Sequence, residues 1–385
     1  MFSVYNNLEK FGIYIHVPFC RRRCIYCDFY FEIGKNTQQF HENVLLEWEA
    51  RKHEAPGEPQ TIYFGGGTPS LLSPAQIGAL ITALGPKAGE ITLEANPEDL
   101  SPQYLAEIRR AGVNRLSLGV QSFEDPILKY LGRKHRSEQA KQAILDAKAA
   151  GFERISVDLI VGVASESTQS ATSWLAEQKI GHLSVYLLTV ENLTPLDRLI
   201  KKGRLQAPCE DAQVDAYIEM QARLPTLGYE QYEVSSYAMP GHESQHNRIY
   251  WSKGSYLGLG PGAHSMLMHA DGTITRRHTH ALLQDWQKKA GEASFKEERL
   301  SQNEALLEAL AFGIRDMQAG IWPDGLSQKH QTKLPLGFEP LVIKLIDQGW
   351  LKQRGQCVHM TQLGARFADA VAREILSLDP GSSPG

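Results

Sequence analysis

The first half of the chain alternates short β-rich runs with segments of helical periodicity, and this alternation restricts the possible folds more than any other feature. Repeated strand–helix units predict a parallel sheet, here of about six strands, curved or closed like part of a TIM-type barrel. The expected strands span residues 13–17, 61–64, 90–94, 115–121, 154–160 and 182–189. The expected helices span residues 39–53, 74–84, 102–111, 137–150 and 168–178.

Residues at the ends of these segments support the helix boundaries. Ser73 and Ser101 each precede a proline, as expected of an N-cap followed by proline in the first helical turn. Gly112 and Gly151 follow their helices, where a glycine commonly ends a helix.

The pattern changes after about residue 193. A helix is expected at 211–224, an extended segment at 229–237, and then a loop rich in His, Asn and aromatic residues. Helices at 302–313 and 340–348 and a hairpin at 351–360 follow, which indicates a small α+β domain of winged-helix type. We therefore expect a (β/α)6 barrel core at 1–195, a barrel extension and linker at 196–299, a C-terminal domain at 300–378, and a disordered tail at 379–385.

Three cysteines directly follow the first expected strand. Cys20, Cys24 and Cys27 lie in the run Cys-Arg-Arg-Arg-Cys-Ile-Tyr-Cys, and the other two cysteines are far away in the sequence. A cubane iron–sulfur cluster usually takes four thiolates, so three would leave one iron open to an outside ligand. The alternative is a structural zinc site with His16 as its fourth ligand, although zinc sites usually pair cysteines as CxxC.

Composition restricts the location and the partners. Five cysteines, three of them clustered, do not form a disulfide framework and indicate a reducing compartment, the cytoplasm. The net charge of -4 argues against broad nucleic-acid binding. No apolar run approaches the roughly 20 residues that span a bilayer, and residues 1–7 do not form a signal peptide.

Polar and glycine-rich residues fall at or just after the ends of the expected strands. A Gly-Gly-Gly-Thr-Pro turn follows the second strand at 65–69, Glu94 ends the third, Gln121 ends the fourth, and Asp158 lies late in the fifth. Parallel barrels gather their functional groups at the carboxyl ends of the strands. We therefore expect these residues to meet the cysteines at one mouth of the barrel. The simpler alternatives are that the glycines only form a tight turn and that Glu94 and Asp158 only form salt bridges within the barrel.

The CxxxCxxC spacing, with an aromatic residue before the last cysteine, resembles the radical S-adenosylmethionine (SAM) superfamily. The resemblance implies a 4Fe-4S cluster on Cys20, Cys24 and Cys27 whose open iron chelates SAM. It also implies cleavage of SAM to a 5′-deoxyadenosyl radical by the reduced cluster. It places Gly66, Gly67 and Thr68 along the methionine part of SAM. The residues that it implies around the rest of the SAM pocket are Tyr14, Tyr26, Glu94, Gln121, Arg133 and Asp158.

Three further runs, at 14–20, 118–123 and 131–133, resemble the coproporphyrinogen III oxidase-like group. This group contains the oxygen-independent oxidase and the HemW-type haem chaperones. The oxidase carries another cysteine two residues after the triplet, where this chain has Phe29, and it has a longer N-terminal arm. Both departures favour the chaperone type.

The run His-Asn-Arg-Ile-Tyr-Trp at 246–251 matches the HNxxYW sequence of the chaperone branch. Neutral imidazole is a good ligand for haem iron, so the resemblance implies His246 as a haem ligand. His242 and His264 are weaker alternatives. Without the resemblance, a packed, hydrogen-bonded histidine would be the expectation.

The expected function is a haem chaperone that binds the cluster, SAM and haem and passes haem to an acceptor, a haem-requiring respiratory protein. The alternative is the oxygen-independent oxidase, which decarboxylates coproporphyrinogen III. The arginine run at 21–23 predicts either attraction of an acidic electron donor such as a flavodoxin or a cluster potential raised by its charge. We expect no nucleic-acid partner and no transmembrane segment, although transient contact with membrane proteins fits the expected acceptor.

Overall fold

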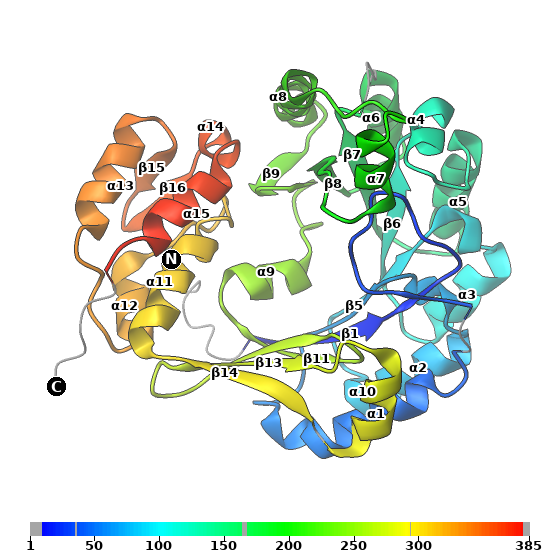
Figure 1. Cartoon of the computed structure of the whole chain (residues 1–385), viewed down its shortest axis with the longest axis horizontal. Helices are drawn as coiled ribbons and strands as arrows, with labels where there is room; N and C mark the ends of the chain where they lie inside the picture. The colour runs from blue at the N-terminus through cyan, green and yellow to red at the C-terminus, as the bar shows by residue number, and fades with distance from the viewer. Residues whose placement is uncertain (1–9, 35–36, 164–167, 293, 380–385) are drawn as a thin grey trace.

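Six parallel strands form the centre of the fold and lie in the sheet in their order along the chain (Figure 1). They are β1 (Phe11–Val17), β4 (Thr61–Gly66), β5 (Glu90–Ala95), β6 (Arg115–Gln121), β7 (Arg154–Val161) and β8 (His182–Leu187). The structure is a computed structural model that describes residues 10–34, 37–163, 168–292 and 294–379. The predicted partial (β/α)6 barrel is therefore confirmed.

Helices cover the outer side of the curved sheet, as Figure 1 shows. They are α1 (Phe40–Arg51), α2 (Pro74–Leu84), α3 (Pro102–Arg110), α4 (Asp125–Tyr130), α5 (Ser137–Ala149) and α6 (Thr168–Glu177). Ser73 caps α2 as predicted, because its hydroxyl accepts the Gln76 backbone N–H in a capping box. The short helix α4 was not predicted from the sequence. Buried residues fill both faces of β1, as expected of a strand between two covered faces.

Further strands extend the sheet at both edges to twelve among the described residues. Beyond β1 lie β11 (Ser255–Leu259), β12 (His264–Met268), β13 (Ile274–Thr279) and β14 (Phe295–Leu300); beyond β8 lie β10 (Ser236–Ala238) and β9 (Glu230–Glu233). β11 runs parallel to β1, with Phe11 opposite Ser255. The region expected to be an extension and linker therefore contributes strands to the same sheet. It also contains the helices α7 (Pro195–Lys201), α8 (Glu210–Thr226) and α10 (Leu283–Lys289).

The HNxxYW run is helical, and its prediction as a loop is wrong. It forms α9 (Gln245–Trp251), and the side chain of Ser244 caps this helix by accepting the backbone N–H of Asn247. The helix contacts β1, β4 and β11. The packing of one face against these strands stabilises a helix too short to form alone.

The C-terminal part has an apolar core of its own, which includes Leu306, Leu310, Leu345 and Val371. Its elements are α11 (Gln302–Gly313), α12 (Pro323–Lys329), α13 (Phe338–Asp347), the hairpin strands β15 (Leu351–Arg354) and β16 (Cys357–Met360), α14 (Gln362–Ala365) and α15 (Ala368–Leu376). Helices and a hairpin are what the sequence predicted here. The exact domain boundaries stay predictions, and residues 380–385 of the expected tail lie outside the described residues.

The described helices include none that is both long and apolar enough to cross a membrane.

Candidate functional site

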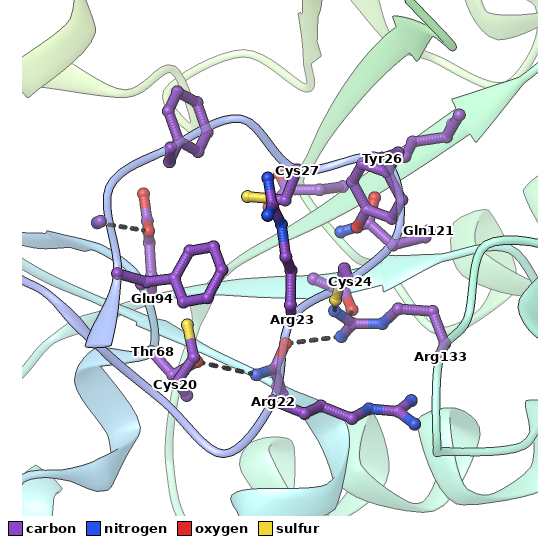
Figure 2. A pocket seen from close by; sticks show the side chains of 18 of the residues that line it. Cys20, Arg22, Arg23, Cys24, Tyr26, Cys27, Thr68, Glu94, Gln121 and Arg133 are labelled. Atoms are coloured by element: carbon purple, nitrogen blue, oxygen red, sulfur yellow. Dashed lines mark hydrogen bonds between the residues drawn. The ribbon is translucent and has the colours of Figure 1, made fainter. Parts of the chain in front are cut away.

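The three clustered cysteines line one cavity of about 480 Å³ at the carboxyl ends of the parallel strands (Figure 2). Cys20 ends the short strand β2 (Phe19–Cys20), which pairs with β3 (Glu32–Ile33), while Cys24 and Cys27 lie on the loop between them. The backbone bond from Glu32 N–H to Pro18 O, 2.6 Å long, closes this loop at its base. The loop therefore presents three sulfur donors to the same space.

Burial raises the pKa of the Cys20 thiol, and it raises that of Cys27 to about 11. A metal that binds these thiols would therefore have to displace their protons. Among the described residues, no three His, Cys, Asp or Glu side chains are close enough to share one metal ion. A cluster would not require three donors close to one metal ion, since each thiolate would bind a different iron atom. Three soft sulfur donors around one cavity fit an iron–sulfur cluster.

The glycine-rich turn after β4 lies directly against Cys20. Gly66 has a φ of 109°, which glycine adopts without strain. A Cβ on Gly67 would lie 2.7 Å from Phe19 O and 3.0 Å from Cys20 Sγ, so the turn leaves no room for a larger residue. The Thr68 hydroxyl lies 3.5 Å from Cys20 Sγ and donates toward it. Gly66, Gly67 and Thr68 all line the cavity, as the sequence predicted.

Two carboxylates lie on the floor of the cavity, Glu94 on β5 and Asp158 on β7, the two strands that flank β6. Glu94 accepts hydrogen bonds from the Tyr63 hydroxyl (2.8 Å) and the Gly66 backbone N–H (3.1 Å). Asp158 accepts one from the Ser117 hydroxyl at 3.3 Å. Burial raises the pKa of Glu94 to about 7 and that of Asp158 to about 6. Neither carboxylate forms a salt bridge in the described structure, so a cationic ligand would find both available.

Arg133 and Asn96 connect the floor of the cavity to the cysteine loop. Arg133 donates to Cys24 Sγ at 3.5 Å, to Asn96 Oδ1 at 2.5 Å and to Gly119 O at 2.7 Å. The side-chain Nε of Arg133 is buried and has no hydrogen-bond partner among the residues that the structure describes. Asn96 was not identified from the sequence, although it directly follows β5 and lies two residues after Glu94.

Tyr26 and Gln121 also line the cavity, as predicted. Gln121 ends β6 at a register shift against β7, with a φ of 71°. A non-glycine residue in the left-handed region is uncommon and is concentrated at functional sites.

Tyr14 does not line the cavity, contrary to the prediction. Its hydroxyl lies 3.1 Å from His16 Nδ1, and its ring stacks on Tyr63 with 6.1 Å between ring centroids. Tyr14 therefore lies beneath the cavity, packed against the side chain that holds Glu94.

His246 does not fit the predicted role of haem ligand. Its side chain is 1% exposed, Nδ1 lies 2.7 Å from the Thr61 hydroxyl, and Nε2 lies 2.7 Å from the Tyr250 hydroxyl. Burial lowers the pKa of its imidazole to about 3, so the ring is neutral. Both ring nitrogens are engaged, and neither is free to bind iron in this conformation. The alternative His264 is exposed and stacks on His278, with 4.2 Å between ring centroids.

The three residues of the arginine run have different surroundings. Arg21 pairs with Asp99 at 2.7 Å, and Arg22 donates to the Gly132 backbone oxygen. Arg23 lies over the ring of Phe31, 5.6 Å from its centroid. Two of the three guanidinium groups thus fasten the cysteine loop to the barrel.

Comparison with known proteins gives the class first. A model of the radical SAM superfamily matches residues 14–171. The fold superposes on the solved structure described as "Coproporphyrinogen III oxidase (HemN) from Escherichia coli is a Radical SAM enzyme" with a TM-score of 0.77, over 97% of this chain and 93% of that chain, at 21% identity. The fold and the cysteine loop are therefore those of a radical SAM protein.

The sequence relatives are more specific. The chain is 34% identical over 377 residues to the haem chaperone HemW of Lactococcus lactis, covering 94% of this chain and 96% of that protein. It is 36% identical over 393 residues to radical S-adenosyl methionine domain-containing protein 1, mitochondrial, of Bos taurus, covering 96% and 88%. This chain belongs to the HemW family of radical SAM proteins.

Proposed function

We propose that the chain binds a 4Fe-4S cluster through Cys20, Cys24 and Cys27 and binds SAM beside it, in the cytoplasm. The observation that carries this proposal is that all three thiols open into the cavity on whose floor Glu94 and Asp158 lie. A cluster with three protein ligands supplies one iron with an open position and an electron for a bound sulfonium. An odd number of cysteines, five with three of them clustered, fits a reducing compartment.

Different residues around the cavity would contact different parts of SAM. Gly66 and Gly67 let the ligand approach the backbone closely, because no Cβ intervenes. Glu94 and Asp158 accept hydrogen bonds from an ammonium group or from ribose hydroxyls. Burial makes both carboxylates costly to ionise, and a cation bound beside them would offset that cost by stabilising their charged forms.

We propose further that the chain carries haem and transfers it to an acceptor, a haem-requiring respiratory protein. The support is the haem chaperone among its relatives, matched over almost the full length of both chains. An acidic electron donor such as a flavodoxin would reduce the cluster. Arg21 and Arg22 are engaged by Asp99 and by the Gly132 backbone oxygen, so Arg23 is the arginine of the loop whose charge could serve either a donor or an anionic ligand.

Anaerobic reconstitution tests the cofactor proposal. Iron and sulfide are expected in the wild-type protein and absent from a variant with all three cysteines changed to alanine. The matched control is Cys209→Ala, which changes an exposed cysteine outside the cavity. Zinc in place of iron in the wild type and in Cys209→Ala would contradict a cluster.

Haem transfer tests the chaperone proposal. The haem-loaded protein is incubated with a haem-free respiratory cytochrome, and transfer is followed by the absorption of the acceptor. The full-length fold likeness to the oxidase makes decarboxylation the second candidate. Formation of protoporphyrinogen IX from coproporphyrinogen III, reductant and SAM would favour that enzyme over the chaperone.

A further inference from the structure

The exposed residues that line the cavity, here called its rim, include large apolar side chains as well as polar or charged ones such as Asp28, Thr189 and Glu191. Phe29, Tyr186 and Leu187 all line the cavity, yet their side chains are 66%, 45% and 39% exposed. Large apolar side chains that gather at the mouth of a cavity mark a binding surface more often than isolated exposed ones do. The rim therefore offers a ligand a surface that the fold itself leaves uncovered.

The rim is built from two segments that are far apart in the sequence but are fastened together. Phe29 lies on the cysteine loop, and Tyr186 and Leu187 end β8. The backbone N–H of Leu196 donates to Ile25 O at 2.8 Å, and both residues belong to one small apolar cluster. This contact ties the cysteine loop to the segment that follows β8.

The rim also carries charges of both signs, on Arg21, Arg23, Asp28 and Glu191. Arg23 is exposed, lines the same cavity and has no carboxylate partner among the described residues. Its guanidinium lies over Phe31, which itself lines the cavity. Figure 2 shows Arg23 extending from the loop near Cys27. An apolar surface beside an unpaired arginine suits a ligand that is both apolar and anionic.

The floor is already assigned to the cluster and SAM, so a third ligand must lie at the rim. We propose that Phe29, Tyr186 and Leu187 bind the apolar face of haem, an iron porphyrin with two propionates, and that Arg23 pairs with a propionate. This inference rests on the proposed haem function and adds its place on the molecule. Haem at the rim would cover the cavity in which the cluster and SAM lie.

Haem titration of the anaerobically reconstituted full chain tests this placement. The Phe29→Ser, Leu187→Ser double variant is expected to bind haem about tenfold more weakly than the wild type. Arg23→Gln is expected to bind several-fold more weakly, with a smaller effect at high salt. Leu193→Ser is the matched control, since Leu193 is 72% exposed near the end of β8 but does not line the cavity. Its affinity is expected to be unchanged.

The outcomes separate the two proposals. If the wild type does not bind haem, the haem function and this placement both fail. If the wild type binds haem and the double variant binds equally well, the placement alone is wrong. Iron content and SAM affinity must stay at wild-type values in the double variant; their loss would mean that the rim only supports the loop. If Arg23→Gln slows reduction by a flavodoxin and leaves haem affinity unchanged, the charge serves the electron donor and the placement of the propionate is overturned.

Discussion

Arg133 donates a hydrogen bond to the sulfur of Cys24, 3.5 Å away, from a position 109 residues further along the chain. The same guanidinium holds Asn96, which donates to the Thr68 hydroxyl at 3.3 Å, and Thr68 donates in turn toward Cys20. One polar chain thus joins two of the three proposed cluster ligands across the cavity. Groups of this kind orient metal ligands and adjust their charge.

Replacement of Arg133 should therefore weaken the cluster without removing any ligand. We expect Arg133→Met to lower iron affinity by about 10- to 100-fold, the usual effect of losing an outer partner of a metal ligand. Iron retention during anaerobic chelator titration measures this. Lys134→Met removes a neighbouring exposed charge and should behave like the wild type. Equal iron retention in both variants would show that Arg133 does not support the site.

Gly67→Ala should displace Cys20. The added methyl would lie 2.7 Å from Phe19 O and 3.0 Å from Cys20 Sγ, so the cysteine loop must move away from β4. We expect loss of most of the iron and sulfide after reconstitution, with an unchanged circular dichroism spectrum. Gly57→Ala is the control, because a Cβ there meets no atom within 4 Å. A normal cluster in Gly67→Ala would contradict the close approach.

SAM affinity should rise with pH through the neutral range. The sulfonium and ammonium groups of SAM favour ionised carboxylates, whereas burial raises the pKa of Glu94 to about 7 and that of Asp158 to about 6. Below these values SAM must displace protons, so binding weakens. Equilibrium dialysis with the cluster-loaded protein between about pH 5.5 and pH 8 measures this.

Glu94→Gln is the matching variant for this pH dependence. This variant should bind SAM more weakly near pH 8. Its SAM affinity should keep only the pH-dependent change that comes from Asp158, near pH 6. The same linkage predicts that the unliganded wild type loses stability as pH rises from about 4.5 to 7, because the unfolded chain releases the Glu94 proton first. An affinity for SAM that does not change with pH would contradict the role of both carboxylates.

His246→Ala should destabilise the fold and leave haem binding unchanged. The substitution leaves the buried Thr61 hydroxyl and the Tyr250 hydroxyl without their partner and opens a cavity under α9. We expect a loss of about 2–4 kcal/mol in the free energy of unfolding, measured with urea. His53→Ala, at an exposed position in the turn after α1, should change neither property. A tenfold loss of haem affinity at unchanged stability would restore His246 as a ligand.

Sequence reasoning was most accurate where local chemistry fixes the structure. β6 and α2 begin and end at the predicted residues, because strand composition, an N-cap serine and a proline act within a few positions. It failed for α9, where Ser244 caps a helix that packing against β1 and β4 stabilises. Asn96 was missed for the same reason, since its partners Thr68 and Arg133 lie on other parts of the chain.

The amino-acid order alone determined the parallel sheet, the three-cysteine loop after its first strand and the polar residues at the strand ends, because each depends on short-range spacing. The tertiary structure decided which of these residues share the cavity. It placed Glu94, Asp158 and Arg133 around the thiols, and it placed the buried His246 and the half-buried Tyr14 outside that cavity. Whether a histidine is a free ligand or a hydrogen-bonded core residue depends on the partners around both ring nitrogens, and these come from distant segments that only folding brings together.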